Sequence, residues 1–132
     1  MEKAQFQFEG FKIKKSLIDI NKDNNLDLSI KFRPSGVLNK KDSIFILTLD
    51  VVIKDSEKLN IEISSESFFN FSNIEEERLS KFIYINAPSI MFPYLRAYIS
   101  SLTALSGISP ITLPTLNLSG LRDELKSNTV IL

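Results

Sequence analysis

The chain contains neither cysteine nor histidine, so any catalysis would have to depend on carboxylate groups. Glu62 and Glu66 lie on the same side of an alternating segment, and Glu75–Glu77 form a run at the start of a helical pattern. A catalytic pair of carboxyl groups needs one member in an apolar setting that raises its pKa above that of the other. Neither set has such a setting, so we expect no enzymatic activity.

No metal or other cofactor is expected. Zinc sites built from thiolates or imidazoles are excluded by the composition. Asp19, Asp23 and Asp27, with asparagines between them, superficially resemble a calcium-binding loop. The central glycine and terminal glutamate of such a loop are missing, so we interpret this segment as a polar turn between strands.

Charge and apolar segment length argue against nucleic-acid binding, membrane insertion and export. The 132 residues include 16 basic and 16 acidic side chains, so no net positive field gathers nucleic acid. The most apolar segment, Ile44–Ile53, is too short to span a bilayer, which takes about 20 residues. The first residues lack the apolar run of a signal peptide. We expect one domain over residues 1–132, without membrane insertion, located in the cytoplasm.

Most of the first 71 residues alternate between apolar and polar side chains, which is typical of half-buried strands. We expect strands over residues 5–13, 26–33, 43–54 and 59–71. Gly10 lies where the alternation changes parity, which predicts a bulge or kink. Short polar loops between the four strands favour an antiparallel sheet.

The period then changes to that of helices. Ser72 or Asn73 could cap a short helical segment whose first turn is acidic. Apolar residues from Ile90 onward recur at three-and-four spacing until Gly107, which predicts a long amphipathic helix. Pro88 suits a first helical turn, but Pro93 lies inside the pattern, so the helix either begins near Phe92 or bends there.

A crossover and a second helix complete the pattern. Residues 108–118 combine prolines with regularly spaced apolar residues, which favours an ordered crossover lying on apolar surface. Ser119 could cap a short final helix that runs through Leu125. The predicted fold is therefore α+β: a four-stranded antiparallel sheet with a long helix, a crossover loop and a short C-terminal helix packed on one face.

Residues 86–121 resemble the SecB family of export chaperones. The most specific part is the entry into the long helix, formed by Pro88, Ile90, Met91, Phe92, Pro93, Tyr94 and Arg96. Gly107 matches a helix-ending glycine, and a proline-rich crossover before the second helix is matched by Leu113, Leu116, Asn117 and Leu118. The resemblance implies that the chain holds unfolded client polypeptides in apolar grooves for export or translocation, without catalysis.

The resemblance also implies a homotetramer, a dimer of dimers with the long helices sandwiched between the sheets. Apolar residues near the matched segment are the candidates for client binding: Phe68, Phe69, Ile83, Tyr84, Met91, Phe92, Leu113, Leu116 and Leu118. The candidates for contacts between subunits are Phe6 and Phe8 on the first strand, with Tyr98 and Leu102 on the long helix. For each aromatic candidate, burial in the core of one subunit is the alternative.

Two kinds of further partner are compatible with such a chaperone, the motor ATPase SecA and an antitoxin. Export chaperones of the family present an acidic sheet face and a distinctive C-terminal tail to the motor ATPase SecA. This chain is neutral, ends on KSNTVIL, and mixes Glu62 and Glu66 with Lys31, Arg33 and Lys54 on the expected outer face. Members of the same family also serve a single partner, such as an antitoxin, so a dedicated chaperone or adaptor is the alternative function.

Overall fold

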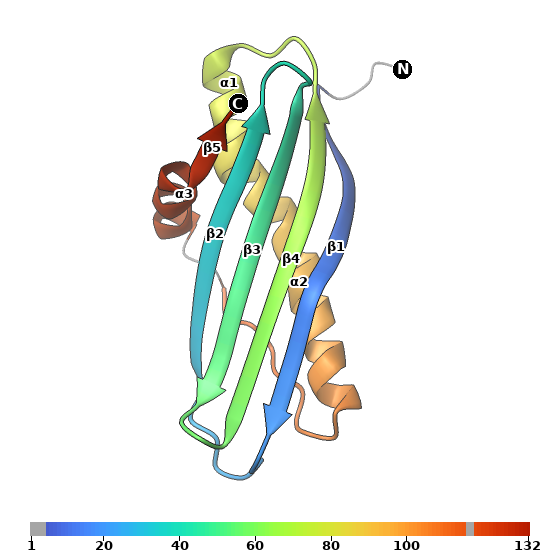
Figure 1. Cartoon of the computed structure of the whole chain (residues 1–132), viewed down its shortest axis with the longest axis vertical. Helices are drawn as coiled ribbons and strands as arrows, with labels where there is room; N and C mark the ends of the chain where they lie inside the picture. The colour runs from blue at the N-terminus through green and yellow to red at the C-terminus, as the bar shows by residue number, and fades with distance from the viewer. Residues whose placement is uncertain (1–4, 116–117) are drawn as a thin grey trace.

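The computed structural model describes residues 5–115 and 118–132, with the side chains of residues 118 and 119 left out. A single sheet has the strand order β1-β4-β3-β2-β5, and helices cover one of its faces (Figure 1). The strands are β1 (Phe6–Ile20), β2 (Ser29–Asn39), β3 (Ile44–Asp55), β4 (Leu59–Phe71) and β5 (Thr129–Ile131). The predicted α+β fold with four antiparallel strands is confirmed, and β5 adds a fifth strand in parallel to β2.

The alternation of side chains along β3 and β4 builds the core. On both strands the odd-numbered residues face the helices, and most of them are almost fully buried apolar residues. Because successive side chains of a strand point to opposite faces, the even-numbered residues form the outer face. The helix-facing core residues of these two strands are Phe45, Leu47, Leu49, Val51, Ile53, Leu59, Ile61, Ile63 and Phe69.

Strand β1 is longer than expected and contains two bulges. The predicted irregularity at Gly10 is confirmed, because the pairing with β4 shifts register between Phe8 and Gly10. A second shift lies between Ile13 and Lys15 and extends the strand to Ile20. Each bulge inserts one residue, so Phe8, Ile13 and Ile20 can all face the helices although their parities differ.

Three helical segments follow β4 after a short loop and are continuous with one another. They are α1 (Glu76–Lys81), a π-helical turn η1 (Phe82–Asn86) and α2 (Ala87–Leu105). Of the two alternatives for the start of the long helix, a start near Phe92 is wrong: α2 begins at Ala87, Pro88 lies in its first turn as predicted, and Pro93 lies within it. Neither expected cap residue is used, since Glu75 precedes α1 and makes no side-chain capping bond.

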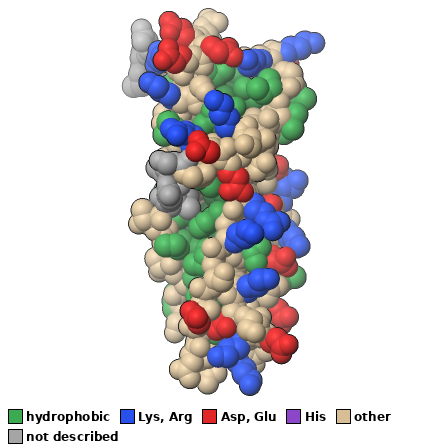
Figure 2. Space-filling view, turned by 90° about the vertical axis from the view of Figure 1, so that its left-hand side faces the viewer, with side chains coloured by type: hydrophobic (Ala, Val, Ile, Leu, Met, Phe, Trp, Pro, Cys, Tyr) green, Lys and Arg blue, Asp and Glu red, His purple; other side chains and the backbone are tan. Residues whose placement is uncertain are grey.

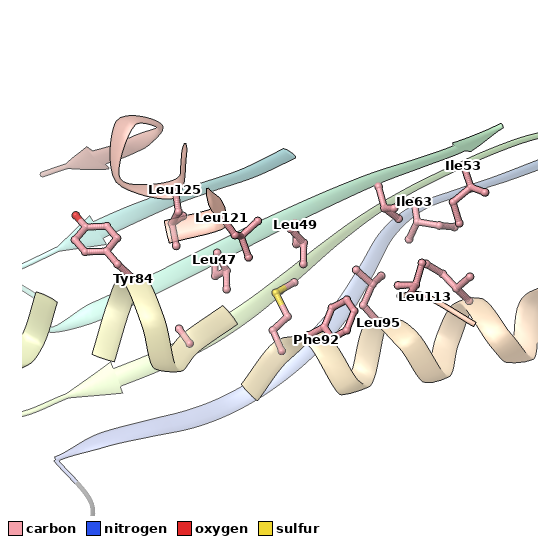
Figure 3. Packing of buried hydrophobic residues seen from close by; sticks show 14 of the residues in the cluster. Leu47, Leu49, Ile53, Ile63, Tyr84, Phe92, Leu95, Leu113, Leu121 and Leu125 are labelled. Atoms are coloured by element: carbon pink, nitrogen blue, oxygen red, sulfur yellow. The ribbon is translucent and has the colours of Figure 1, made fainter. Parts of the chain in front are cut away.

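The chain then returns along α2 to a short third helix. Gly107 adopts a left-handed conformation with φ of 88° and follows the end of α2, as predicted. The crossover, residues 108–115, buries Ile108, Ile111 and Leu113. Helix α3 (Leu118–Ser127) packs against β2 and η1, and its Leu121 and Leu125 join the same core as Phe92 and Leu95 of α2 (Figure 3).

Candidate functional site

The expected client-binding residues divide between the core and two surfaces. Phe69, Ile83, Met91 and Leu113 are at most 1% exposed, so in this subunit they support the surface from below. Tyr84 and Phe92 are 9% and 8% exposed and lie at the boundary of the core. Leu116 and the side chain of Leu118 fall outside the described residues.

Phe68 lies on the opposite face of the sheet from Phe69. The register places Phe68 beside Ile46, Ile46 beside Val37, and Val37 beside Val130. These four residues therefore form an apolar row across the outer face, from β4 to β5. Because the sheet separates this row from the helices, Phe68 does not share a surface with the other candidates.

Tyr84 borders two hollows between the helices at one end of the molecule. The larger, of about 700 Å³, has Tyr84 and Ile85 as its apolar lining, with charged residues of α1 and α3 around them. The smaller, of about 190 Å³, reaches from Ile83 and Tyr84 to Leu38 on β2 and Ile131 on β5. This end of the site combines an apolar floor with a rim of both charge signs.

Strand β2 and the segment just before it present an incompletely covered row of apolar side chains. Leu26, Leu28, Ile30 and Phe32 all face the helices but are only half-buried, whereas the facing residues of β3 are fully buried. We call these four residues the inner row. They lie at the margin of the sheet, so an added extended chain would cover them.

Among the described residues, the edge of β2 that faces away from β3 has no partner strand beside Ile30 and Phe32. Strand β5 pairs only with Gly36–Leu38, and no described residue forms a strand beside Ser29–Arg33, which we call the free edge. Pro34 separates the two parts: it has no amide hydrogen, and its carbonyl accepts a bond from Asn128 Nδ2 at 3.1 Å. The free edge is a ready template for an additional strand.

Helix α2 borders the free edge with an aromatic ring and a cation. The rings of Phe92 and Phe32 meet edge to face with 6.1 Å between centroids. The guanidinium carbon of Arg96, one turn further along α2, lies 5.0 Å from the centroid of the Phe92 ring. Its Nε is buried and has no hydrogen-bond partner among the described residues. An unsatisfied buried donor is costly, so this position favours a ligand that brings an oxygen atom.

The expected subunit-contact residues gather on one side of the molecule, where β1 lies against α2. Phe8 contacts Tyr94 with ring centroids 5.1 Å apart, and Tyr98 donates a hydrogen bond of 2.8 Å to Ser16 Oγ. Phe6 lies on the same strand and stacks on Phe69. Leu102, one turn after Tyr98, is half-buried on the same stripe of the helix.

Two exposed residues extend this side and were not among the expected site residues. Tyr94 is 46% exposed and Leu105 is 89% exposed. Their spacing with Tyr98 and Leu102 is visible in the sequence and could have identified them. The rest of the exposed surface of α2 carries small or polar side chains without charge: Ser89, Pro93, Ala97, Ser101 and Ala104. A 19-residue helix whose only charged residue is Arg96 is suited to lie against another protein surface.

Two of the carboxylates considered for catalysis form ion pairs with lysines. Glu66 is on the outer face and pairs with Lys14 at 3.5 Å, and Glu76 pairs with Lys40. Among the described residues no group of three or more acidic side chains could hold a metal ion. Nor does that part of the chain include a helix of the length and apolarity needed to cross a membrane.

Comparison with known proteins identifies the same family over nearly the whole chain. The family model described as "Preprotein translocase subunit SecB" matches residues 5–128. The protein MJ0357 of Methanocaldococcus jannaschii is 30% identical over 129 residues, which cover 90% of this chain and 83% of that protein. The protein-export protein SecB of Dechloromonas aromatica is 33% identical over 78 residues, covering 58% of this chain and 51% of that protein. The match thus spans about half the length of that export protein.

A solved structure shares the fold. The SecB-like chaperone Rv1957 of Mycobacterium tuberculosis superposes with a TM-score of 0.72 at 17% identity, over 86% of this chain and 88% of that one. That protein was solved in complex with a ChAD peptide from the antitoxin HigA1.

Proposed function

We propose that this chain, which belongs to the SecB family, is a molecular chaperone that holds unfolded polypeptides for translocation. The observation that carries the proposal is the free edge of β2 beside the half-buried inner row. Family membership also supports a binding role in place of catalysis, because the matching model is that of a translocase subunit. We place this activity in the cytoplasm, where such clients are made.

Client holding follows from what an unfolded chain exposes. Its apolar side chains gain free energy when they leave water, at about 25 cal/mol per Å² buried, and its backbone groups need hydrogen-bond partners. The inner row supplies apolar surface, and the free edge supplies amide hydrogens and carbonyl oxygens. A folded protein has already satisfied both needs internally, so it is not retained.

The proposed contact surface combines expected and newly identified residues. Phe92 and Tyr84 contribute partly accessible rings, and the more deeply buried candidates support them from below. The proposed client-contacting residues are Leu28, Ile30, Phe32, Tyr84, Ile85, Phe92 and Arg96. The hollow beside Tyr84 extends this surface toward α3.

We propose a homotetramer built as a dimer of dimers. Strand β1 lies at one margin of the sheet, where its backbone can pair with β1 of a second copy. The uncharged surface of α2, together with Tyr94 and Leu105, can pack against a further pair of subunits. Several client sites in one assembly would turn weak contacts into tight retention of a long client.

Native mass spectrometry of the purified protein, alone and with a permanently unfolded polypeptide, tests this function. The expected species is a tetramer of about four times 15.0 kDa that captures the unfolded chain and ignores the same protein in its folded form. Equal binding of folded and unfolded forms, or no capture at all, would contradict a holding function.

A dedicated chaperone for one partner, such as an antitoxin, is the second candidate. It is favoured by the outer face, which combines Lys31, Arg33 and Lys54 with Glu62 and Glu66 and gives SecA no acidic surface to dock on. Rv1957, which shares this fold, was solved in complex with a peptide from the antitoxin HigA1. Capture of several unrelated unfolded proteins with similar affinity would support the general chaperone, and capture of a single sequence would support the dedicated one.

A further inference from the structure

The free edge offers backbone groups in a defined direction. Gly36 N donates to Asn128 O and Leu132 N donates to Leu38 O, so the even-numbered residues of β2 direct their backbone groups away from β3. The pairing of β2 with β3 has no register shift. Ile30 and Phe32 therefore present their amide hydrogens and carbonyl oxygens outward along the free edge.

The same edge already holds one extended segment of this chain. Strand β5 binds beside Gly36–Leu38 through backbone hydrogen bonds and places Val130 next to Val37. Pairing by an extended segment is thus compatible with the shape of this margin. A client segment on the free edge would continue the sheet in the same way.

A strand added there would present its side chains alternately to two different environments. Those directed toward the helices would meet Ile30, Phe32 and the ring of Phe92. Those directed outward would lie beside Lys31 and Arg33, which are exposed on the outer face of β2. An adjoining hollow of about 530 Å³ on this face is lined by three cations and one anion: Lys31, Arg33, Lys54 and Glu62.

The charged side chains of the free edge itself, Lys31 and Arg33, are both positive, and the acidic groups near them, Asp50 and Glu62, lie on β3 and β4. Every charged residue of β2, the crossover (residues 108–115) and α2 is a cation: Lys31, Arg33 and Arg96. On β3, Asp50 is opposite Arg33, and Lys54 is opposite Ser29. The view onto this margin in Figure 2 shows Lys and Arg side chains gathered midway along the molecule, next to hydrophobic surface.

We propose that this chain selects extended client segments in which apolar and acidic residues alternate, and binds them as an additional strand along Ser29–Arg33. The apolar side chains cover the inner row, and the acidic side chains pair with Lys31 and Arg33 across the strands. Arg96 Nε donates to an oxygen atom of the client near Phe92. The inference rests on the proposed holding function and adds the charge preference and the binding register to it.

Three labelled peptides of equal length test the charge preference. Each carries valine or phenylalanine at alternate positions, and the positions between them are all glutamate, all serine or all lysine. Fluorescence anisotropy at low salt is expected to give affinities in the order glutamate, serine, lysine, with about a tenfold range between the extremes from two cross-strand charge pairs. Because exposed charges are screened, the range should shrink at 0.5 M NaCl.

A charge-reversed protein tests the register. In the double variant Lys31→Glu, Arg33→Glu the order of the peptides should reverse. Lys41→Glu makes the same kind of change in the exposed turn between β2 and β3 and should leave the order unchanged. The variant Lys31→Gln, Arg33→Gln should abolish the preference without introducing new repulsion, and circular dichroism verifies the fold of each protein. Hydrogen exchange of the Ile30 and Phe32 amides should slow when the glutamate peptide binds.

The outcomes separate this inference from the function on which it rests. Capture of an unfolded protein together with equal affinity for the three peptides would overturn the charge preference and leave the holding function intact. Protection of amides elsewhere, with none at Ile30 and Phe32, would overturn the strand addition. Failure to bind any unfolded polypeptide would overturn both.

Discussion

Thr103 connects the crossover to α2 and offers a sharp test of how the site is held together. Its side chain is fully buried, its hydroxyl donates to Ile99 O at 2.8 Å, and its oxygen accepts the Ile111 amide hydrogen at 2.9 Å. Replacement by valine keeps the shape of the side chain but removes the acceptor. The Ile99 carbonyl keeps its bond within the helix, so the one group left without a partner is the Ile111 amide.

The size of the effect follows from that single orphaned donor. Leaving a buried amide hydrogen unsatisfied costs about 1 to 3 kcal/mol. With about 4 °C per kcal/mol for a chain of this length, a loss of about 2 kcal/mol lowers the melting temperature by about 8 °C. Thr103→Ser keeps the acceptor and loses one buried methyl group, which costs about 1 kcal/mol.

Thermal melting followed by circular dichroism measures the stability, at one protein concentration because assembly shifts the transition. Hydrogen exchange of the Ile111 amide identifies the cause: it should be fast in Thr103→Val and slow in Thr103→Ser. Ser106→Ala removes a hydroxyl that bonds to Leu102 O on exposed helix surface, and it should change little. An unchanged melting temperature and unchanged Ile111 exchange in Thr103→Val would refute the anchoring role.

Five further substitutions, two matched pairs and one single change, test other features. Gly36→Ala places a methyl group 2.8 Å from a ring atom of the buried Phe45 and should lower the free energy of unfolding by about 1 to 3 kcal/mol. Gly10→Ala meets no atom within 4 Å, so the free energy of unfolding, measured by denaturant titration, should change by less than about 0.5 kcal/mol. Ser65→Ala removes a buried hydrogen bond of 2.7 Å to Leu49 O and should lower the free energy of unfolding in urea by about 1 kcal/mol. Ser67→Ala removes a buried hydroxyl that has no described hydrogen-bond partner and should stabilise the protein. Equal effects of the two substitutions would contradict this difference in hydrogen bonding. Tyr94→Asp puts a charge on the proposed assembly surface and should shift native mass spectra from tetramer to smaller species without unfolding the subunit; an intact tetramer would exclude that surface.

The strands could be predicted because alternation reports directly on a sheet with one buried face. Gly10 marked a parity change, and the bulge is there. The second bulge also coincides with a change of parity, because Ile13 and Ile18 differ in parity while both face the helices. The residues between them are mostly polar, so this change could not be recognised in the sequence. Strand β5 has three residues, too few to establish a period, and only its neighbour β2 makes it a strand.

The helices and the site depended more on tertiary contacts. Pro93 is exposed within α2, where the lost hydrogen bond is offset by packing of the opposite surface. Adjacent residues such as Phe68 and Phe69 must point to opposite faces, but which face is covered depends on where the helices lie. The spacing of Tyr94, Tyr98, Leu102 and Leu105 places all four on one stripe of the helix, but only the folded structure shows that Tyr94 and Leu105 are exposed.

Pro34 sets a limit on how much polypeptide the free edge can hold. A strand added along Ser29–Arg33 spans five residues, or about 17 Å, and its ladder cannot continue past a residue that has no amide hydrogen. On the proposed strand addition, each captured segment would be short and would dissociate rapidly, so that a client could leave segment by segment. The same interruption would keep the β2 edges of two copies from pairing along their whole length, and we expect it to limit aggregation of the protein through this edge.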